Sequence, residues 1–145
     1  MDTKMSVKEY LKQYKILTGK VRRYEERIEQ IEASLQRSID LDGLPKSTKT
    51  SDPTKETAIK LATIHEKMSG AVLEAEMARQ LISDQIELID RHEYRELLYS
   101  RYILLLPWED VTDRVSIGRK ERYDSKHIAG YMHAEALRAF EEVIK

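Results

Sequence analysis

Apolar residues recur along the first part of the chain in alternating steps of three and four, with Lys, Arg and Glu between them. This heptad spacing predicts one long amphipathic helix of about 33 residues that begins at Val7. Ser6 and Glu9 fit a capping box at its start, and Gly19 is its weakest position. The apolar stripe consists of Val7, Tyr10, Tyr14, Leu17, Val21, Tyr24, Ile28, Ile31 and Leu35.

A second stripe with the same spacing follows a polar break. Residues 40–52 contain a glycine, a proline and a Ser/Thr/Lys run, which favours a plain linker over a phosphorylated or ligand-binding loop. Residues 51–53, Ser-Asp-Pro, then predict the start of a second long helix. Because only about 12 residues separate the two helices, we expect a long, coiled-coil-like antiparallel helical hairpin. The second stripe consists of Leu61, Ile64, Met68, Ala71, Ala75, Ala78, Ile82, Gln85 and Ile89.

Some large side chains near this hairpin need a separate interpretation. Leu73, Leu81, Ile86 and Leu88 lie off the second stripe, which predicts either docking of a C-terminal unit or self-association. Tyrosines recur in the first stripe and could form a stacking ladder for single-stranded nucleic acid. Their positions on the stripe favour packing, because a tyrosine there buries its ring and keeps its hydroxyl at the edge.

The last third of the chain predicts three further helices. An apolar helix over residues 94–105 is closed by Pro107, and residues 108–115 place Trp108, Val111 and Val115 on one face. Asp124 or Ser125 can cap a last helix whose inner stripe contains Ala129, Met132, Ala136 and Phe140. Two short helices, a turn and a third helix follow the helix-turn-helix plan, in which the last helix enters the major groove of DNA.

Two motifs in this region resemble a known family. RELLYSRYILLLPWEDV is similar to the fourth region of sigma-70-type factors, and HAEALRAFEEV resembles the closing segment of phage-encoded regulators related to the RinA and ArpU late-gene activators. The segments SVKEYLKQYKILTGKVRRYEERIEQIE and SDPTKETAIKLATIHEKM resemble the same group, so the likeness covers most of the chain. The resemblance implies a phage or prophage transcriptional regulator, a late-gene activator that reads promoter DNA through its last helix.

The expected fold is therefore all-α, with a helical hairpin for oligomerisation over residues 1–91 and a helix-turn-helix domain that resembles sigma region 4 over residues 92–145. Expected partners are double-stranded DNA, host RNA polymerase and a second copy of the chain in a homodimer, which would match two half-sites. Two alternatives remain: a DNA-packaging protein resembling a small terminase subunit, and a module that binds RNA polymerase but not DNA.

The net charge of −1 does not itself indicate nucleic-acid binding. The charge is uneven, however, because residues 114–138 carry six basic side chains against three acidic ones. This local excess could contact phosphates, although a solvated loop of mixed charge is an equally good interpretation.

The predicted DNA-binding residues lie on the outer face of the last helix and on the connector before it. Lys126, His127 and Tyr131 would offer donors and an aromatic edge, and Gly130 would let the backbone approach DNA closely. His133 could be a core residue, a base contact or a dimer contact. The full predicted set is Arg119, Lys120, Arg122, Ser125, Lys126, His127, Gly130 and Tyr131.

The connector, residues 116–124, is longer than the usual turn of three or four residues in this motif. It could be an insertion that adds phosphate contacts. It could instead mean that the last two helices have lost their standard crossing.

The sequence contains no residue pattern typical of a catalytic, metal-binding or nucleotide-binding site. The five scattered glycines form no phosphate loop, the four histidines share no metal-ligand spacing, and no serine lies in a nucleophile-elbow context. We therefore expect no catalytic residues, no metal and no cofactor. The absence of cysteine excludes disulfides, and the lack of a long apolar run predicts a cytoplasmic protein without a membrane partner.

Overall fold

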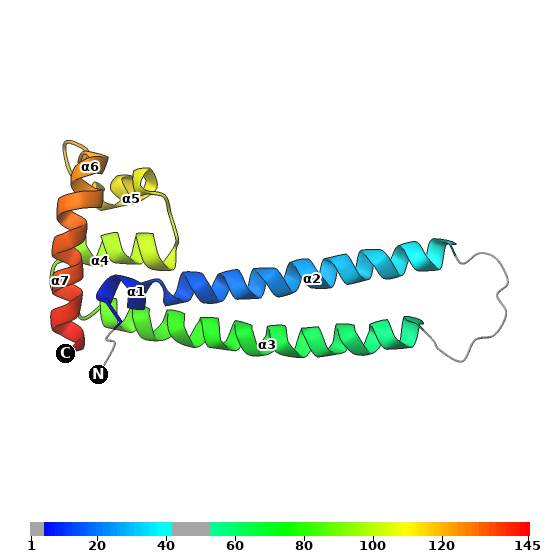
Figure 1. The fold of residues 1–145 in the computed structure, drawn as a ribbon. Helices are drawn as coiled ribbons and strands as arrows, with labels where there is room; N and C mark the ends of the chain where they lie inside the picture. Colours follow the sequence, from blue (N-terminus) through cyan, green and yellow to red (C-terminus); the bar gives the residue numbers. More distant parts are fainter. Residues whose placement is uncertain (1–4, 42–52) are drawn as a thin grey trace. The chain divides into compact units, whose positions relative to one another are not determined.

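The computed structural model describes residues 5–41 and 53–145, and within these ranges all regular structure is helical (Figure 1). The expected all-α class is thus confirmed. The predicted linker, residues 40–52, and the predicted Ser51-Asp52 cap lie almost wholly outside the described residues. The elements are α1 (Val7–Leu11), α2 (Gln13–Leu41), α3 (Pro53–Ile86), α4 (His92–Leu98), the π-helix η1 (Tyr99–Ile103), α5 (Trp108–Val115), α6 (Ser125–His127), the π-helix η2 (Ile128–Met132) and α7 (His133–Ile144).

The first predicted helix is interrupted near its start. Ser6 caps α1 and accepts a hydrogen bond from the Glu9 backbone N–H at 3.1 Å, which is one of the two hydrogen bonds of the predicted capping box. The regular helix then breaks at Lys12 and not at Gly19. The backbone N–H of Lys12 still donates to the Lys8 carbonyl at 3.1 Å, so the helical path continues through the break.

Burial follows the two predicted stripes closely. Every residue of both stripes is buried or half-buried, and Ile28, Ile64 and Ala71 are among the buried ones. The residues between the stripe positions are mostly exposed, as expected for solvated helix faces. The tyrosines pack as predicted: the Tyr10 hydroxyl donates to Oε1 of Gln85 at 2.6 Å, and its ring lies 6.0 Å from that of Phe140.

The chain divides into two compact units that differ from the predicted domains. One unit comprises residues 17–74, and the other combines residues 1–16 with residues 75–145. The predicted division into 1–91 and 92–145 differs because residues from both ends of the first range pack into the C-terminal core. The unit of residues 17–74 contains segments of α2 and α3 that lie side by side in Figure 1, with Lys20 Nζ 3.7 Å from Glu74 Oε1.

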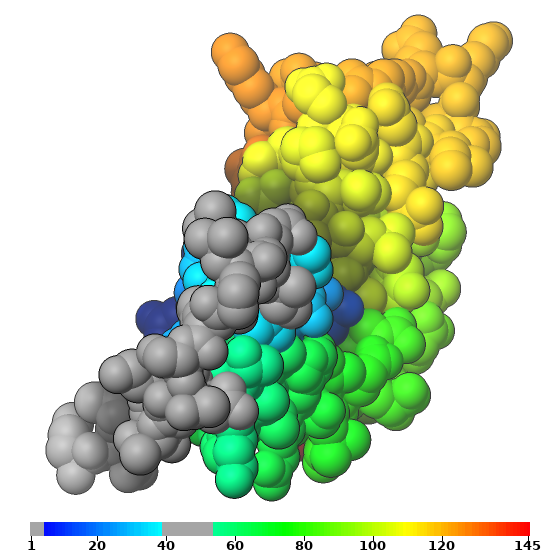
Figure 2. Space-filling model, turned by 90° about the vertical axis from the view of Figure 1, so that its right-hand side faces the viewer, coloured from blue at the N-terminus to red at the C-terminus, as the bar shows by residue number. Residues whose placement is uncertain are grey.

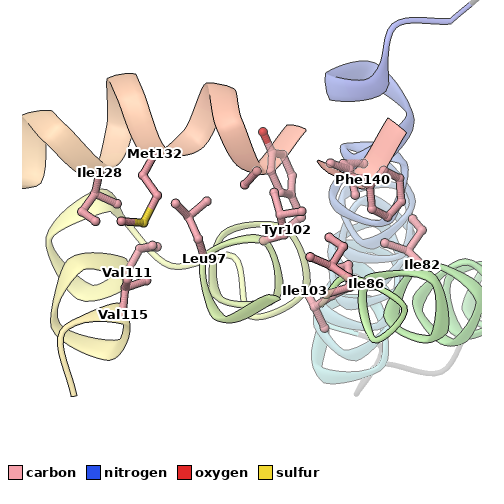
Figure 3. Close-up of a cluster of buried hydrophobic side chains, with 14 residues drawn as sticks. Ile82, Ile86, Leu97, Tyr102, Ile103, Val111, Val115, Ile128, Met132 and Phe140 are labelled. Carbon is pink, nitrogen blue, oxygen red and sulfur yellow. The ribbon is translucent and has the colours of Figure 1, made fainter. Parts of the chain in front are cut away.

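The core of the other unit joins segments from distant parts of the chain. Leu11 of α1 and Ile82 and Ile86 of α3 are almost fully buried together with residues of the C-terminal helices. In Figure 3, Phe140 lies toward Ile82 and Ile86. Of the four leucines and isoleucines off the second stripe, Ile86 docks here, whereas Leu73, Leu81 and Leu88 are exposed.

The C-terminal helices agree with the predicted plan, with differences at their ends. The helix α5 matches the predicted range 108–115, and Val111 and Val115 of its apolar face are buried. The predicted helix over 94–105 begins at His92 and widens into η1 before it ends. Just beyond η1, Leu105 has a φ of 58°, a left-handed conformation in which a leucine is strained.

Candidate nucleic-acid interface

The last helix runs from Ser125 to Ile144 as α6, η2 and α7, with Asp124 at the N-cap position. Its inner side comprises Ile128, Met132, Ala136 and Phe140, all 5% exposed or less. In Figure 3, Ile128 and Met132 point toward Val111 of α5 and Leu97 of α4. The predicted inner stripe began at Ala129, but this residue is only half-buried. The wide π-turn of η2 changes which residues face inward at this point of the helix.

The opposite side of this helix is open to solvent. Lys126, His127, Gly130 and Tyr131 are all exposed, and Tyr131 keeps 65% of its surface. Ser125 is half-buried at the first turn. Four of the predicted contact residues therefore share an accessible face that the protein core leaves uncovered.

Three rings form a stacked row on this face. The ring of His127 lies 5.8 Å from that of Tyr123 and 5.4 Å from that of Tyr131, with interplanar angles of 15° and 24°. Tyr123 was not among the predicted contact residues, although its spacing of four from His127 could have indicated it. Such a row presents flat aromatic faces and edges together with the donors of the imidazole and phenol groups.

Tyr123 carries the first ring of this row and is held in place by several contacts. Its hydroxyl donates to the Glu93 carboxylate, which lowers the pKa of Glu93 and raises the pKa of Tyr123. Its backbone N–H donates to Oγ of Ser116 at 3.0 Å, and the Arg119 guanidinium lies 3.8 Å above its ring. The row is thus anchored to α4 and to the connector.

The cations of the connector differ in their surroundings. Residues 116–124 project at the upper right of Figure 2. Arg122 lies between two carboxylates, with Nε 2.6 Å from Asp113 Oδ1 and Nη2 3.0 Å from Glu109 Oε1. Asp113 and then Glu109 raise the pKa of Arg122. A DNA phosphate would compete with both carboxylates for the Arg122 side chain. Lys120, two residues earlier in the connector, is exposed.

His133 is a core residue, which decides between the three roles left open by its sequence. It is 7% exposed, and its Nε2 lies 2.7 Å from the Tyr102 hydroxyl. Its ring also meets the Trp108 ring edge-on at 4.9 Å. Burial lowers the pKa of His133 to about 4, assisted by the charges of Lys8 and Arg101. The side chain is therefore neutral at physiological pH and does not face outward.

Residues 5–41 and 53–145 were also considered as a possible metal site or membrane span, and they provide neither. These residues contain no group of three or more His, Cys, Asp or Glu side chains that could hold a metal ion. No helix among them is long and apolar enough to cross a membrane.

Comparison with known proteins leaves the family open. No family model, no curated protein and no solved structure matches this chain.

Proposed function

We propose that this protein is a phage or prophage transcriptional regulator, a late-gene activator that binds promoter DNA through its last helix. The observation that carries the proposal is the accessible polar face of that helix. Lys126, His127 and Tyr131 are exposed on it, while the opposite face is buried against α4 and α5. In helix-turn-helix proteins, residues in the first turns of the last helix contact base edges.

The order of the preceding helices also supports the proposal. The helix α5 contacts both α6 and η2, so the short helix and the last helix pack together despite the long connector. This arrangement is compatible with a helix-turn-helix that resembles sigma region 4 and carries an inserted loop. In this interpretation Arg119 and Lys120 approach the DNA backbone from the connector.

The proposal includes a homodimer formed through a helical hairpin of α2 and α3. Met77 and Leu81, one helical turn apart on α3, are 64% and 53% exposed. An apolar strip of this kind is costly in water and would be covered in a dimer. Sedimentation of the wild type and of Met77→Lys/Leu81→Lys tests this point, with loss of a dimer as the expected result.

The central test is a fluorescence titration of labelled late-promoter DNA at several salt concentrations. The expected affinity falls as salt rises, because Lys and Arg release counterions from the phosphates when they bind. Absence of binding at low salt, or an affinity independent of salt, would overturn the proposal. The same titration of Lys126→Glu tests the role of the last helix. Lys67→Glu on α3 is its matched control, because both lysines are exposed and lie on helices.

One observation favours a second candidate, a module that binds RNA polymerase without DNA. Arg122 is neutralised by Glu109 and Asp113, and this leaves the stacked rings beside a surface of mixed charge. Aromatic side chains at the centre of a polar surface are common in protein interfaces. Capture of purified polymerase by a protein that shows no DNA affinity would select this candidate.

A further inference from the structure

A cavity of about 210 Å³ opens on the other side of the last helix. Its walls come from the N-terminal helical segment, from η1 and the following turn, and from Ala129 and His133 of the last helix. All of these residues belong to one compact unit, residues 1–16 with 75–145. None of the predicted DNA-binding residues lines it.

The lining carries four cationic side chains. Lys8, Lys12 and Lys15 follow one another at helical spacing on one face, and Arg101 reaches the cavity from η1. No described Asp or Glu lines the cavity. Like charges gathered in one place repel each other, so Lys8, Lys12 and Arg101 together favour an anion in the cavity.

The Arg101 guanidinium is held in a defined position. Its Nη1 donates to the Leu106 carbonyl at 2.9 Å, and its central carbon lies 4.4 Å from the centre of the Trp108 ring. The strained residue Leu105, with its left-handed backbone, also lines the cavity. Strained backbone persists where the surrounding structure holds it, and such residues cluster at binding sites.

The remaining lining is uncharged and includes two polar side chains besides apolar ones. Tyr102 and His133 are both buried, and their side chains are already hydrogen-bonded to each other. Neither group contributes a negative charge at neutral pH, so nothing in the lining opposes an anion. The four cations therefore surround a cavity whose other walls are neutral.

We propose that this cavity binds a phosphate group. Its volume is below the roughly 300–1,000 Å³ of pockets for drug-sized ligands, which suits a single anionic group better than a whole nucleotide. A phosphate monoester carries a charge of about −1.5 to −2 and three strong acceptor oxygens, which matches several converging cations better than one carboxylate does. The group can be the monoester of a small phosphorylated ligand or, with a single negative charge, a diester of a nucleic-acid backbone.

The protein contains its own reporter of this site. Trp108 is the single tryptophan of the chain and lines the cavity. Its fluorescence can be titrated with inorganic phosphate at constant ionic strength, with sodium acetate as the comparison anion. We expect a saturable change in emission with phosphate and a weaker one with acetate. A bound anion should also raise the pKa of His133, which NMR measures independently.

The decisive variant is Lys8→Gln/Lys12→Gln, with Lys55→Gln/Lys67→Gln on α3 as a control that removes the same number of exposed lysines. The cavity variant should weaken phosphate binding at least about tenfold, whereas the control should bind as the wild type does. The cavity variant should also melt at a higher temperature without phosphate, because it relieves repulsion. No saturable change with phosphate, or equal binding by both variants, would overturn the proposal.

DNA titration of the same variants identifies the source of the phosphate. If the cavity variant loses DNA affinity and phosphate competes with DNA, the group belongs to the nucleic-acid backbone. If DNA affinity is unchanged while phosphate binding is lost, the cavity serves a small ligand. Lys126→Glu should keep phosphate binding in either case, so failure of the DNA-binding proposal can be told apart from failure of this one.

Discussion

The Tyr102 hydroxyl and Nε2 of His133 lie 2.7 Å apart in the buried core and connect η1 to α7. Their rings are stacked, with centroids 5.8 Å apart and an interplanar angle of 25°. Burial raises the pKa of Tyr102 to about 12, so the phenol keeps its proton at all ordinary pH values. In the neutral tautomer of His133 with its proton on Nδ1, the phenol donates and Nε2 accepts.

Removal of this hydrogen bond should destabilise the protein. Tyr102→Phe keeps the ring but leaves the buried imidazole nitrogen without a partner. An unsatisfied buried polar atom costs about 1–3 kcal/mol, so we expect the free energy of unfolding to fall by that amount. Urea denaturation measures the change. An unaltered midpoint would mean that water replaces the hydroxyl without loss.

Acid should destabilise the protein through His133. The pKa of this imidazole is about 4 in the folded protein and near 6.5 in an unfolded chain. Between these values the unfolded chain binds a proton that the folded protein does not, so stability is lost as the pH falls through 6.5. The loss reaches at most about 3 kcal/mol, and solvent screening beside the cavity reduces it.

Thermal unfolding between about pH 7.5 and pH 5 checks this expectation. Hydrogen bonds from Tyr123 and Ser125 lower the pKa of Glu93 and of Glu109, so these two carboxylates contribute only in more acidic solution. His133→Leu should have a flatter pH dependence than the wild type in this window. Identical slopes for the two proteins would assign the effect to other groups.

Relief of backbone strain should stabilise the turn after η1. Leu105→Gly removes the penalty of a left-handed leucine, about 1–2 kcal/mol, and loses the partial burial of a side chain that is 36% exposed. Relative to Leu105→Ala, which loses the same burial but keeps the strain, we expect a gain of roughly 1 kcal/mol. Gly118→Ala is the reciprocal control, because Gly118 has a φ of 86° and alanine is strained there. Calorimetry should show shifts in opposite directions.

Substitutions on the outer face of the last helix should separate binding from stability. Lys126→Glu and Tyr131→Ala alter exposed side chains outside the core, so each should change the free energy of unfolding by less than about 0.5 kcal/mol. Both should cripple DNA binding. A large fall in melting temperature would show that these side chains support the fold.

Gly130 offers a test of close approach by a ligand. A β-carbon at this position would meet nothing within 4 Å, so Gly130→Ala fits the free protein without rearrangement. Alanine should even favour the helix, by about 1 kcal/mol at most. If DNA approaches the backbone here, the added methyl group weakens binding although the protein is no less stable. Unchanged affinity would exclude such an approach.

Sequence periodicity was sufficient to predict the long helices and α5. The alternating steps of three and four predicted the buried stripes, because burial on a helix follows its repeat. The break at Lys12 and the two π-turns had no such signal, since each depends on local hydrogen bonding within a packed core. The burial of Leu11 was missed for a related reason: it joins a buried cluster whose other members, Ile86 and Phe140 among them, are distant in the sequence.

The candidate site was predicted only in part. Helical spacing correctly placed Lys126, His127 and Tyr131 on an accessible face, because the inner apolar residues define the outer ones. The pairing of Arg122 with Glu109 and Asp113 could not be read from composition, since it depends on how the connector folds back over α5. The cavity beside His133 combines lysines and an arginine about 90 positions apart, and only the tertiary structure brings them together.

The burial of Leu11 against the C-terminal helices also has a consequence for biosynthesis. A ribosome releases residues 5–16 before the C-terminal helices up to Phe140, which complete the core around Leu11. Until then only the part of this core that has already emerged can cover Leu11, so chaperone capture or premature association is favoured during elongation. Conversely, a fragment that begins beyond residue 16 would lack α1. The apolar surface of the C-terminal helices that α1 covers would then be exposed.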